Sequence, residues 1–201
     1  MKPIVGVIVA VVVLVGLYVG YRYWQLQQAA AKYKDAKEVA SESIEKDGSK
    51  WTIKFESVIA KPIDKVWKAM QQPERSSEFI PDFKKSELKK SEGNMKEVEI
   101  QVQVLTLPLQ TFLAQFHFDD AAKQMTMKTL SGPQDVNGTY VLSSLGPDKT
   151  LLSYNATAVD RITVPLPLSV QKGAVRELFV KTIQAIQKGI DSEEQKSKAA
   201  A

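Results

Sequence analysis

The side chains that most often carry catalysis or bind metals are scarce in this sequence. Among its 201 residues there is one histidine, His117, and there is no cysteine. This composition excludes disulfides, thiolate metal sites and cysteine nucleophiles, and a single histidine cannot form a histidine cluster around a metal. His117 lies between Phe116 and Phe118, and because neighbours on a strand face opposite ways, we expect it on the exposed face. We therefore predict no catalytic residue, no metal site and no cofactor.

The charge of the chain is mildly basic, with 27 Lys and Arg against 23 Asp and Glu and a net charge of +4. No stripe of basic residues interleaved with aromatic residues is present, so the sequence does not indicate a nucleic-acid partner. A weak positive charge suits attraction to anionic lipid headgroups instead.

The N-terminus has the pattern of a membrane span. From Ile4 to Val19 every residue is apolar, glycine or tyrosine, and the run extends to Trp24. About 20 residues at ~1.5 Å each give ~30 Å, the thickness of a bilayer core. Tyr and Trp residues gather beside Arg22 at its C-terminal end, as expected at headgroup depth. We predict a single transmembrane anchor over residues 1–24; a cleaved signal peptide ending near the alanines at 29–31 is the alternative.

The flanks of this segment predict its orientation. The C-terminal flank carries Arg22, Lys32, Lys34 and Lys37, whereas the N-terminal flank carries Lys2 and the free amine. The excess favours a cytoplasmic location for the domain that follows, with a periplasmic or other extracytoplasmic location as the alternative. Gly16 and Gly20 have the spacing of small residues that pack two spans together, so a homodimer through this pair is left open.

The rest of the chain divides into three parts. Residues 25–50 are rich in Ala, Gln, Lys and Glu and contain no proline, which predicts a polar helical stalk. Residues 51–190 have the patterning of one folded domain. Residues 191–201 are polar, and we expect a disordered tail.

Within the domain, most segments alternate apolar and polar residues, which is the period of a strand with one buried face. We expect strands over 51–59, 83–91, 95–105, 110–119, 122–131, 137–145 and 149–160. Short helices are expected after Pro62 and Pro73. A long helix is expected over 168–190, with an apolar stripe made of Val175, Phe179, Ile183, Ile186 and Ile190.

This order of elements resembles the START-like superfamily, also called SRPBCC or helix-grip proteins. Within it, the resemblance is to the polyketide cyclase/dehydrase and lipid-transport group that includes the coenzyme Q-binding proteins. The segments FESVIAKPIDKVWKAMQQPERSSEFIP, DFKKSELKKSEGN, VNGTYVLSSLGPDKTLLSYNATAV and PLPLSVQKGAVRELFVKTIQAIQKGI carry the likeness. Tyr140 departs from it, since the family often has Trp there. The fold implied is α+β, a curved antiparallel sheet wrapped around a long C-terminal helix and preceded here by one transmembrane helix.

The resemblance also implies a cavity between the sheet and the C-terminal helix. Apolar side chains from both would line it, and our candidates are Phe112, Phe116, Phe118, Met125, Met127, Tyr140, Leu142, Tyr154, Phe179 and Ile183.

Three functions remain open from the sequence. The first is membrane-tethered binding or transfer of a lipid or other hydrophobic small molecule. The second is a polyketide cyclase or dehydratase-like enzyme, which would need a buried polar pair in the cavity. Tyr140 or Tyr154 beside a buried carboxylate would support it. The third is a protein-interaction module, which would have a filled core and an exposed apolar patch.

Overall fold

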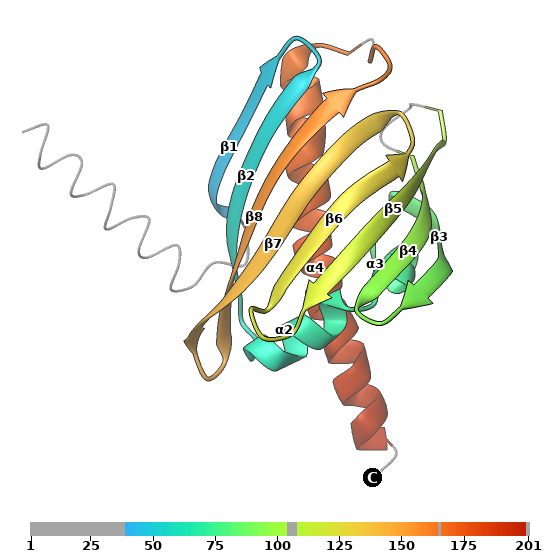
Figure 1. Ribbon diagram of the computed structural model, residues 1–201. Helices are drawn as coiled ribbons and strands as arrows, with labels where there is room; N and C mark the ends of the chain where they lie inside the picture. Colours follow the sequence, from blue (N-terminus) through green and yellow to red (C-terminus); the bar gives the residue numbers. More distant parts are fainter. Residues whose placement is uncertain (1–38, 104–107, 165, 200–201) are drawn as a thin grey trace, which may run out of the picture. The chain divides into compact units, whose positions relative to one another are not determined.

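The computed structural model describes residues 39–103, 108–164 and 166–199 (Figure 1). Eight strands form one antiparallel sheet in the order β1-β2-β8-β7-β6-β5-β4-β3. They are β1 (Val39–Asp47), β2 (Lys50–Ile59), β3 (Phe83–Glu92), β4 (Met95–Val102), β5 (Gln110–Asp119), β6 (Gln124–Ser131), β7 (Gln134–Gly146) and β8 (Lys149–Asp160). The pairing of β2 with β8 is the one contact between strands that are not consecutive in the sequence.

Within the described residues, four helical elements accompany the sheet. Between β2 and β3 lie α2 (Ile63–Met70), the 3-10 helix η1 (Pro73–Arg75) and α3 (Ser76–Phe79), and α4 (Leu168–Ala199) follows β8. Figure 1 shows the sheet curving around α4, with α2 at one end of the sheet and α3 behind β4. This is the helix-grip fold that the order of elements predicted.

The core lies between the concave face of the sheet and α4. Alternate residues of several strands point into it, for example Trp51, Ile53 and Phe55 of β2. From α4, Phe179, Ile183 and Ile190 are buried against them, and Val175 and Ile186 are partly buried. The predicted stripe of the C-terminal helix is therefore its core-facing side. His117 is exposed, as its position between Phe116 and Phe118 predicted.

Two segments differ from the sequence-based expectation. Residues 39–47 form strand β1 and not part of a helical stalk. β1 is an edge strand, and several of its side chains are exposed on both faces, so it lacks the apolar periodicity by which strands are recognised. At the other end, α4 continues to Ala199, so residues 191–199 are helical where we expected a disordered tail. Ion pairs from Asp191, Glu193 and Glu194 to α2, η1 and the loop before α2 stabilise these extra turns.

The predicted transmembrane anchor, with Gly16 and Gly20, lies outside the described residues, as does the first part of the stalk. Among the helices of the described ranges, none is long and apolar enough to span a bilayer.

A polar cluster around Asp160 ties β1 to the rest of the domain. Nε1 of Trp51 donates hydrogen bonds to both carboxylate oxygens of Asp160 at 3.0 Å, and Nε2 of Gln134 donates to Oδ1 at 2.6 Å. Nζ of Lys46 lies 2.8 Å from Oδ2, donates to Oε1 of Gln171 at 2.7 Å, and sits 4.4 Å above the Trp51 ring. One carboxylate thus connects β1, β2, β7 and β8, and Lys46 extends the connection to α4.

Burial alone would raise the pKa of Asp160, but the hydrogen bonds from Lys46, Gln134 and Trp51 outweigh it and lower this pKa below its usual value. A lowered folded-state pKa stabilises the fold above the unfolded pKa, and the stabilisation is lost as the pH falls through the folded pKa. Asp160→Asn should therefore reduce the free energy of unfolding at pH 7 by about 2 kcal/mol. The difference in free energy of unfolding between the wild type and the variant should become smaller below about pH 4. Urea unfolding at several pH values measures both.

Asp148→Asn is the matched control, because Asp148 is exposed in the turn between β7 and β8. It should change the stability by less than about 0.5 kcal/mol. Equal effects of the two substitutions at pH 7 would contradict a stabilising role for the Asp160 cluster.

Candidate functional site

A cavity of about 160 Å³ lies between the sheet, the α2–η1–α3 segment and the C-terminal half of α4. Its inner lining is apolar and comes from both the sheet and the helices, with Met70, Ile80, Ile100, Phe116, Met125 and Met127 among its members. The polar lining residues Gln72, Arg75, Ser76 and Glu193 come from α2–η1–α3 and α4, and they are partly exposed. We place the opening of the cavity between these elements.

Small side chains on α4 create the space. Thr182, Ala185 and Gly189 follow one another at helical spacing and line the cavity, and Ala69 of α2 also lines it. The larger Phe179 and Ile183 of the same helix are buried in the core and do not line the cavity. A small residue at these positions leaves a gap that the sheet does not fill, since packed interiors relax only partly around missing volume.

The structure places the ten predicted lining residues in three groups. Phe116, Met125, Met127 and Tyr140 line the cavity. Phe118, Leu142, Tyr154, Phe179 and Ile183 are buried in the surrounding core and do not line it. Phe112 is partly buried elsewhere, beside Gly132 in the turn between β6 and β7.

The sequence did not predict the helical side of the cavity, which runs from Ala69 through Ile80 and from Thr182 through Glu193. For the segment that begins at Pro73, the sequence predicts a short helix but gives no sign that it lines a cavity. The run of small residues Thr182, Ala185 and Gly189 beside the large stripe was the available signal, because small side chains on a core-facing helix mark either close packing or a gap.

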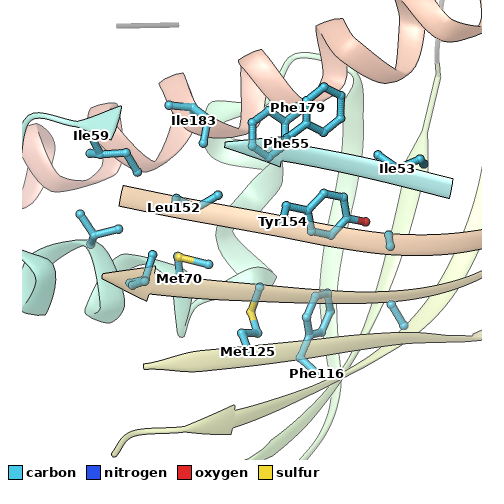
Figure 2. Packing of buried hydrophobic residues seen from close by; sticks show 14 of the residues in the cluster. Ile53, Phe55, Ile59, Met70, Phe116, Met125, Leu152, Tyr154, Phe179 and Ile183 are labelled. Carbon is cyan, nitrogen blue, oxygen red and sulfur yellow. The ribbon is translucent and has the colours of Figure 1, made fainter. Parts of the chain in front are cut away.

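A stack of four aromatic rings runs from the cavity into the core. The rings of Tyr140 and Tyr154 stack with their centroids 4.2 Å apart. Tyr154 lies 6.0 Å from Phe179, which in turn stacks on Phe55 at 4.3 Å. Figure 2 shows Phe55, Phe179 and Tyr154 meeting between α4 and the sheet. Of these four residues Tyr140 alone lines the cavity, and Tyr154, Phe179 and Phe55 are buried in the core behind it.

Burial raises the pKa of both tyrosines. The pKa of Tyr154 rises to about 12, and that of Tyr140 rises further above its ordinary value, because burial disfavours both phenolates and Tyr140 also interacts with Tyr154. The hydrogen-bonding interaction of Tyr140 is thus with another phenol and not with a carboxylate. At neutral pH both side chains stay uncharged.

Arg75 organises the opening. Its Nε and Nη2 donate to the two carboxylate oxygens of Glu78 at 3.0 and 2.9 Å, and its Nη1 donates to Gln72 at 2.8 Å and to Glu193 at 3.1 Å. The hydrogen bonds with Arg75 lower the pKa of Glu78 and those with Glu78 raise the pKa of Arg75, against a smaller opposing effect of burial. The guanidinium also lies 5.5 Å from the Phe79 ring. One side chain therefore links η1, α3 and α4 at the opening.

Comparison with solved structures shows the START-like helix-grip fold. The aromatase/cyclase Zhui from Streptomyces sp. R1128 superposes with a TM-score of 0.63 at 17% identity, over 71% of this chain and 94% of that one. A START superfamily protein from Mycobacterium smegmatis gives 0.58 at 14% identity, over 70% and 97%. The di-domain aromatase/cyclase StfQ of the steffimycin biosynthetic pathway gives 0.54 at 14% identity, over 67% of this chain and 45% of that one.

At these identities the likeness concerns the fold alone, and function has to be argued from the cavity. No protein-family model and no curated protein matches the sequence.

Gly138 tests the aromatic stack. A Cβ atom at this position would lie 2.7 Å from Cε2 and 2.9 Å from the hydroxyl of Tyr154, so Gly138→Ala must displace the stacked ring. We expect the free energy of unfolding to fall by about 2 kcal/mol, the usual penalty for overpacking. Thermal or urea unfolding of the full-length chain measures it.

Gly173→Ala is the matched control, because a Cβ there meets nothing within 4 Å and the position lies inside α4. Helix propensity predicts a gain of about 0.5–1 kcal/mol. The two glycine-to-alanine changes should therefore have opposite signs, and a neutral or stabilising Gly138→Ala would contradict the tight packing of Tyr154.

Proposed function

We propose that the domain binds a hydrophobic small molecule, or an apolar part of a lipid, in the cavity between the sheet and α4. The observation that carries the proposal is the cavity itself: its inner lining is methionine, phenylalanine, isoleucine and one tyrosine ring, and its polar groups stand at the opening. An apolar group that enters such a space is removed from water and gains contacts with the lining. Methionines suit such a site because their flexible side chains adapt to a ligand's shape.

Two observations favour binding over catalysis. Tyr140, the tyrosine that lines the cavity, interacts through its hydroxyl with Tyr154, and a cyclase or dehydratase would require an acid–base pair that reaches the ligand. The carboxylate of Glu193 at the opening is held by Arg75 at 3.1 Å. A protein-interaction module is disfavoured for a different reason, since it predicts a filled core.

We also propose that residues 1–24 anchor the protein in a membrane as a single span, which would keep the domain close to a source of hydrophobic ligand. The support is the apolar run from Ile4 to Val19 with its aromatic flank.

The binding proposal predicts a local response at the methionines. Met70, Met125 and Met127 line the cavity, whereas Met95 does not. Benzyl alcohol added to the full-length chain in lipid nanodiscs should shift the 13C-methyl resonances of the first three residues and leave that of Met95 in place. Shifts of equal size at all four, or none, would contradict binding in the cavity.

A filled cavity should lose this response. Ala185→Leu places three more carbons in the lining, and we expect the affinity for benzyl alcohol to fall by at least about tenfold, or ~1.4 kcal/mol. Ala174→Leu is the control on the same helix, because Ala174 does not line the cavity, and it should leave the affinity unchanged. Titrations followed by the Met125 and Met127 methyls compare the two variants.

The orientation proposal places the domain in the cytoplasm, from the excess of Lys and Arg after the span. Because the chain has no cysteine, Leu145→Cys introduces a single thiol at a site 47% exposed. A membrane-impermeant maleimide should label it only after the membrane is permeabilised. Labelling of intact cells would place the domain on the other side, and extraction of the protein by alkaline carbonate would contradict the span itself.

A further inference from the structure

The dimensions and charges of the cavity define the class of ligand more narrowly than its apolar lining does. We infer that the cavity selects an uncharged apolar group about the size of one six-membered ring or a chain of about six carbons, and that it rejects acids. This inference rests on the proposed function, and it deepens it by naming the ligand class.

The first argument is volume. The cavity measures about 160 Å³, and an apolar protein cavity of about 150 Å³ accommodates benzene. A ring or a short alkyl segment therefore fills the space without moving the lining. The remainder of a longer molecule has to lie outside the opening.

The second argument is the closed inner end. Beyond the ring of Tyr140 the space is occupied by Tyr154, Phe179 and Phe55, which stack on one another. Tyr154 in turn rests against Gly138, with no room for an additional carbon between them. A ligand chain cannot extend past this wall unless a stacked ring moves, so the wall sets the length that the cavity accepts.

The third argument is charge. Arg75 is the one cation among the described lining residues, and its guanidinium already donates to Glu78, Glu193 and Gln72. A ligand carboxylate at the opening would have to compete with two protein carboxylates for this guanidinium, and deeper in the cavity it would lose its hydration without compensation. An alcohol avoids both penalties, because its hydroxyl can remain near Gln72 and Ser76 at the opening.

The length limit is tested with straight-chain alcohols from propan-1-ol to decan-1-ol, bound to the full-length chain and followed at the Met125 and Met127 methyls. Affinity should rise about fourfold per added carbon while carbons enter the cavity. It should level off near six carbons. A rise that continues to decan-1-ol overturns the length limit and leaves the proposed function standing, whereas no binding by any alcohol overturns both.

Substitution of Tyr140 tests the wall directly. Tyr140→Ala removes the ring between the cavity and Tyr154 and leaves additional space there. The chain length at which the affinity stops rising should therefore increase by about two carbons or more. Tyr140→Phe keeps the ring and should keep the wild-type plateau. A gain in affinity for long alcohols cannot result from destabilisation, and if Tyr140→Ala does not fold, Tyr140→Leu makes the same test. An unchanged plateau in a folded variant overturns the role of Tyr140.

The charge selection is tested with benzyl alcohol and benzoate, which have nearly the same shape. At pH 7 benzyl alcohol should bind at least tenfold more tightly. Glu193→Gln frees a donor of Arg75 and should raise the affinity for benzoate more than that for benzyl alcohol. Glu194→Gln is the control, since Glu194 pairs with Lys61 and Lys65 and does not line the cavity. Equal affinities for the two ligands in the wild type overturn the selection against acids.

Discussion

The stacking of Phe179 on Phe55 and Tyr154 holds α4 in the grip of the sheet. These three rings come from α4, β2 and β8, and β2 and β8 are the two strands that pair although they are far apart in the sequence. The aromatic contacts therefore hold α4 over the place where β2 pairs with β8. Stacked aromatic pairs add about 0.5–1.5 kcal/mol each to the burial of their apolar surface. Around Phe179 and Ile183 the interface of α4 is packed, and the cavity lies beside the smaller Thr182, Ala185 and Gly189.

Charge pairs stabilise the half of α4 that lacks this packing. Lys61 lies 2.6 Å from Asp191, Lys65 lies 2.6 Å from Glu194, and Arg75 lies 3.1 Å from Glu193. Each partly exposed pair contributes little alone. Together they connect the last turns of α4 to the α2–η1–α3 segment at several points. Such contacts are well suited to the rim of a ligand site, because ion pairs at the surface can separate and reform at lower free-energy cost than a packed core can open.

The sequence predicted the fold because its strongest signals are periodic. The alternation of Val98 and Ile100 with charged neighbours, and the stripe of Phe179 and Ile183, each specify which face of an element is buried. Periodicity shows which face of an element is buried, but it does not show which of the buried residues pack in the core and which line a cavity. Tyr154 and Tyr140 therefore looked alike from the sequence, although one is in the core and the other lines the cavity. β1 was missed for the opposite reason, since an edge strand with solvent on both faces has little periodicity to detect.

The cavity has an energetic consequence for the whole domain. The apolar side chains that line its 160 Å³ have no packing partners on the cavity side. Missing contacts of this kind matter in a domain, because domains are typically stable by only about 5–15 kcal/mol. Thr182, Ala185 and Gly189 forgo this packing at consecutive turns of one helix face, while Phe179 and Ile183 beside them are fully packed. The unfilled space is confined to one place, between the aromatic stack and the ion-paired residues at the opening. A ligand bound there can supply the missing contacts. Binding and stability are then coupled, because a ligand that fills the space stabilises the folded state in proportion to its occupancy.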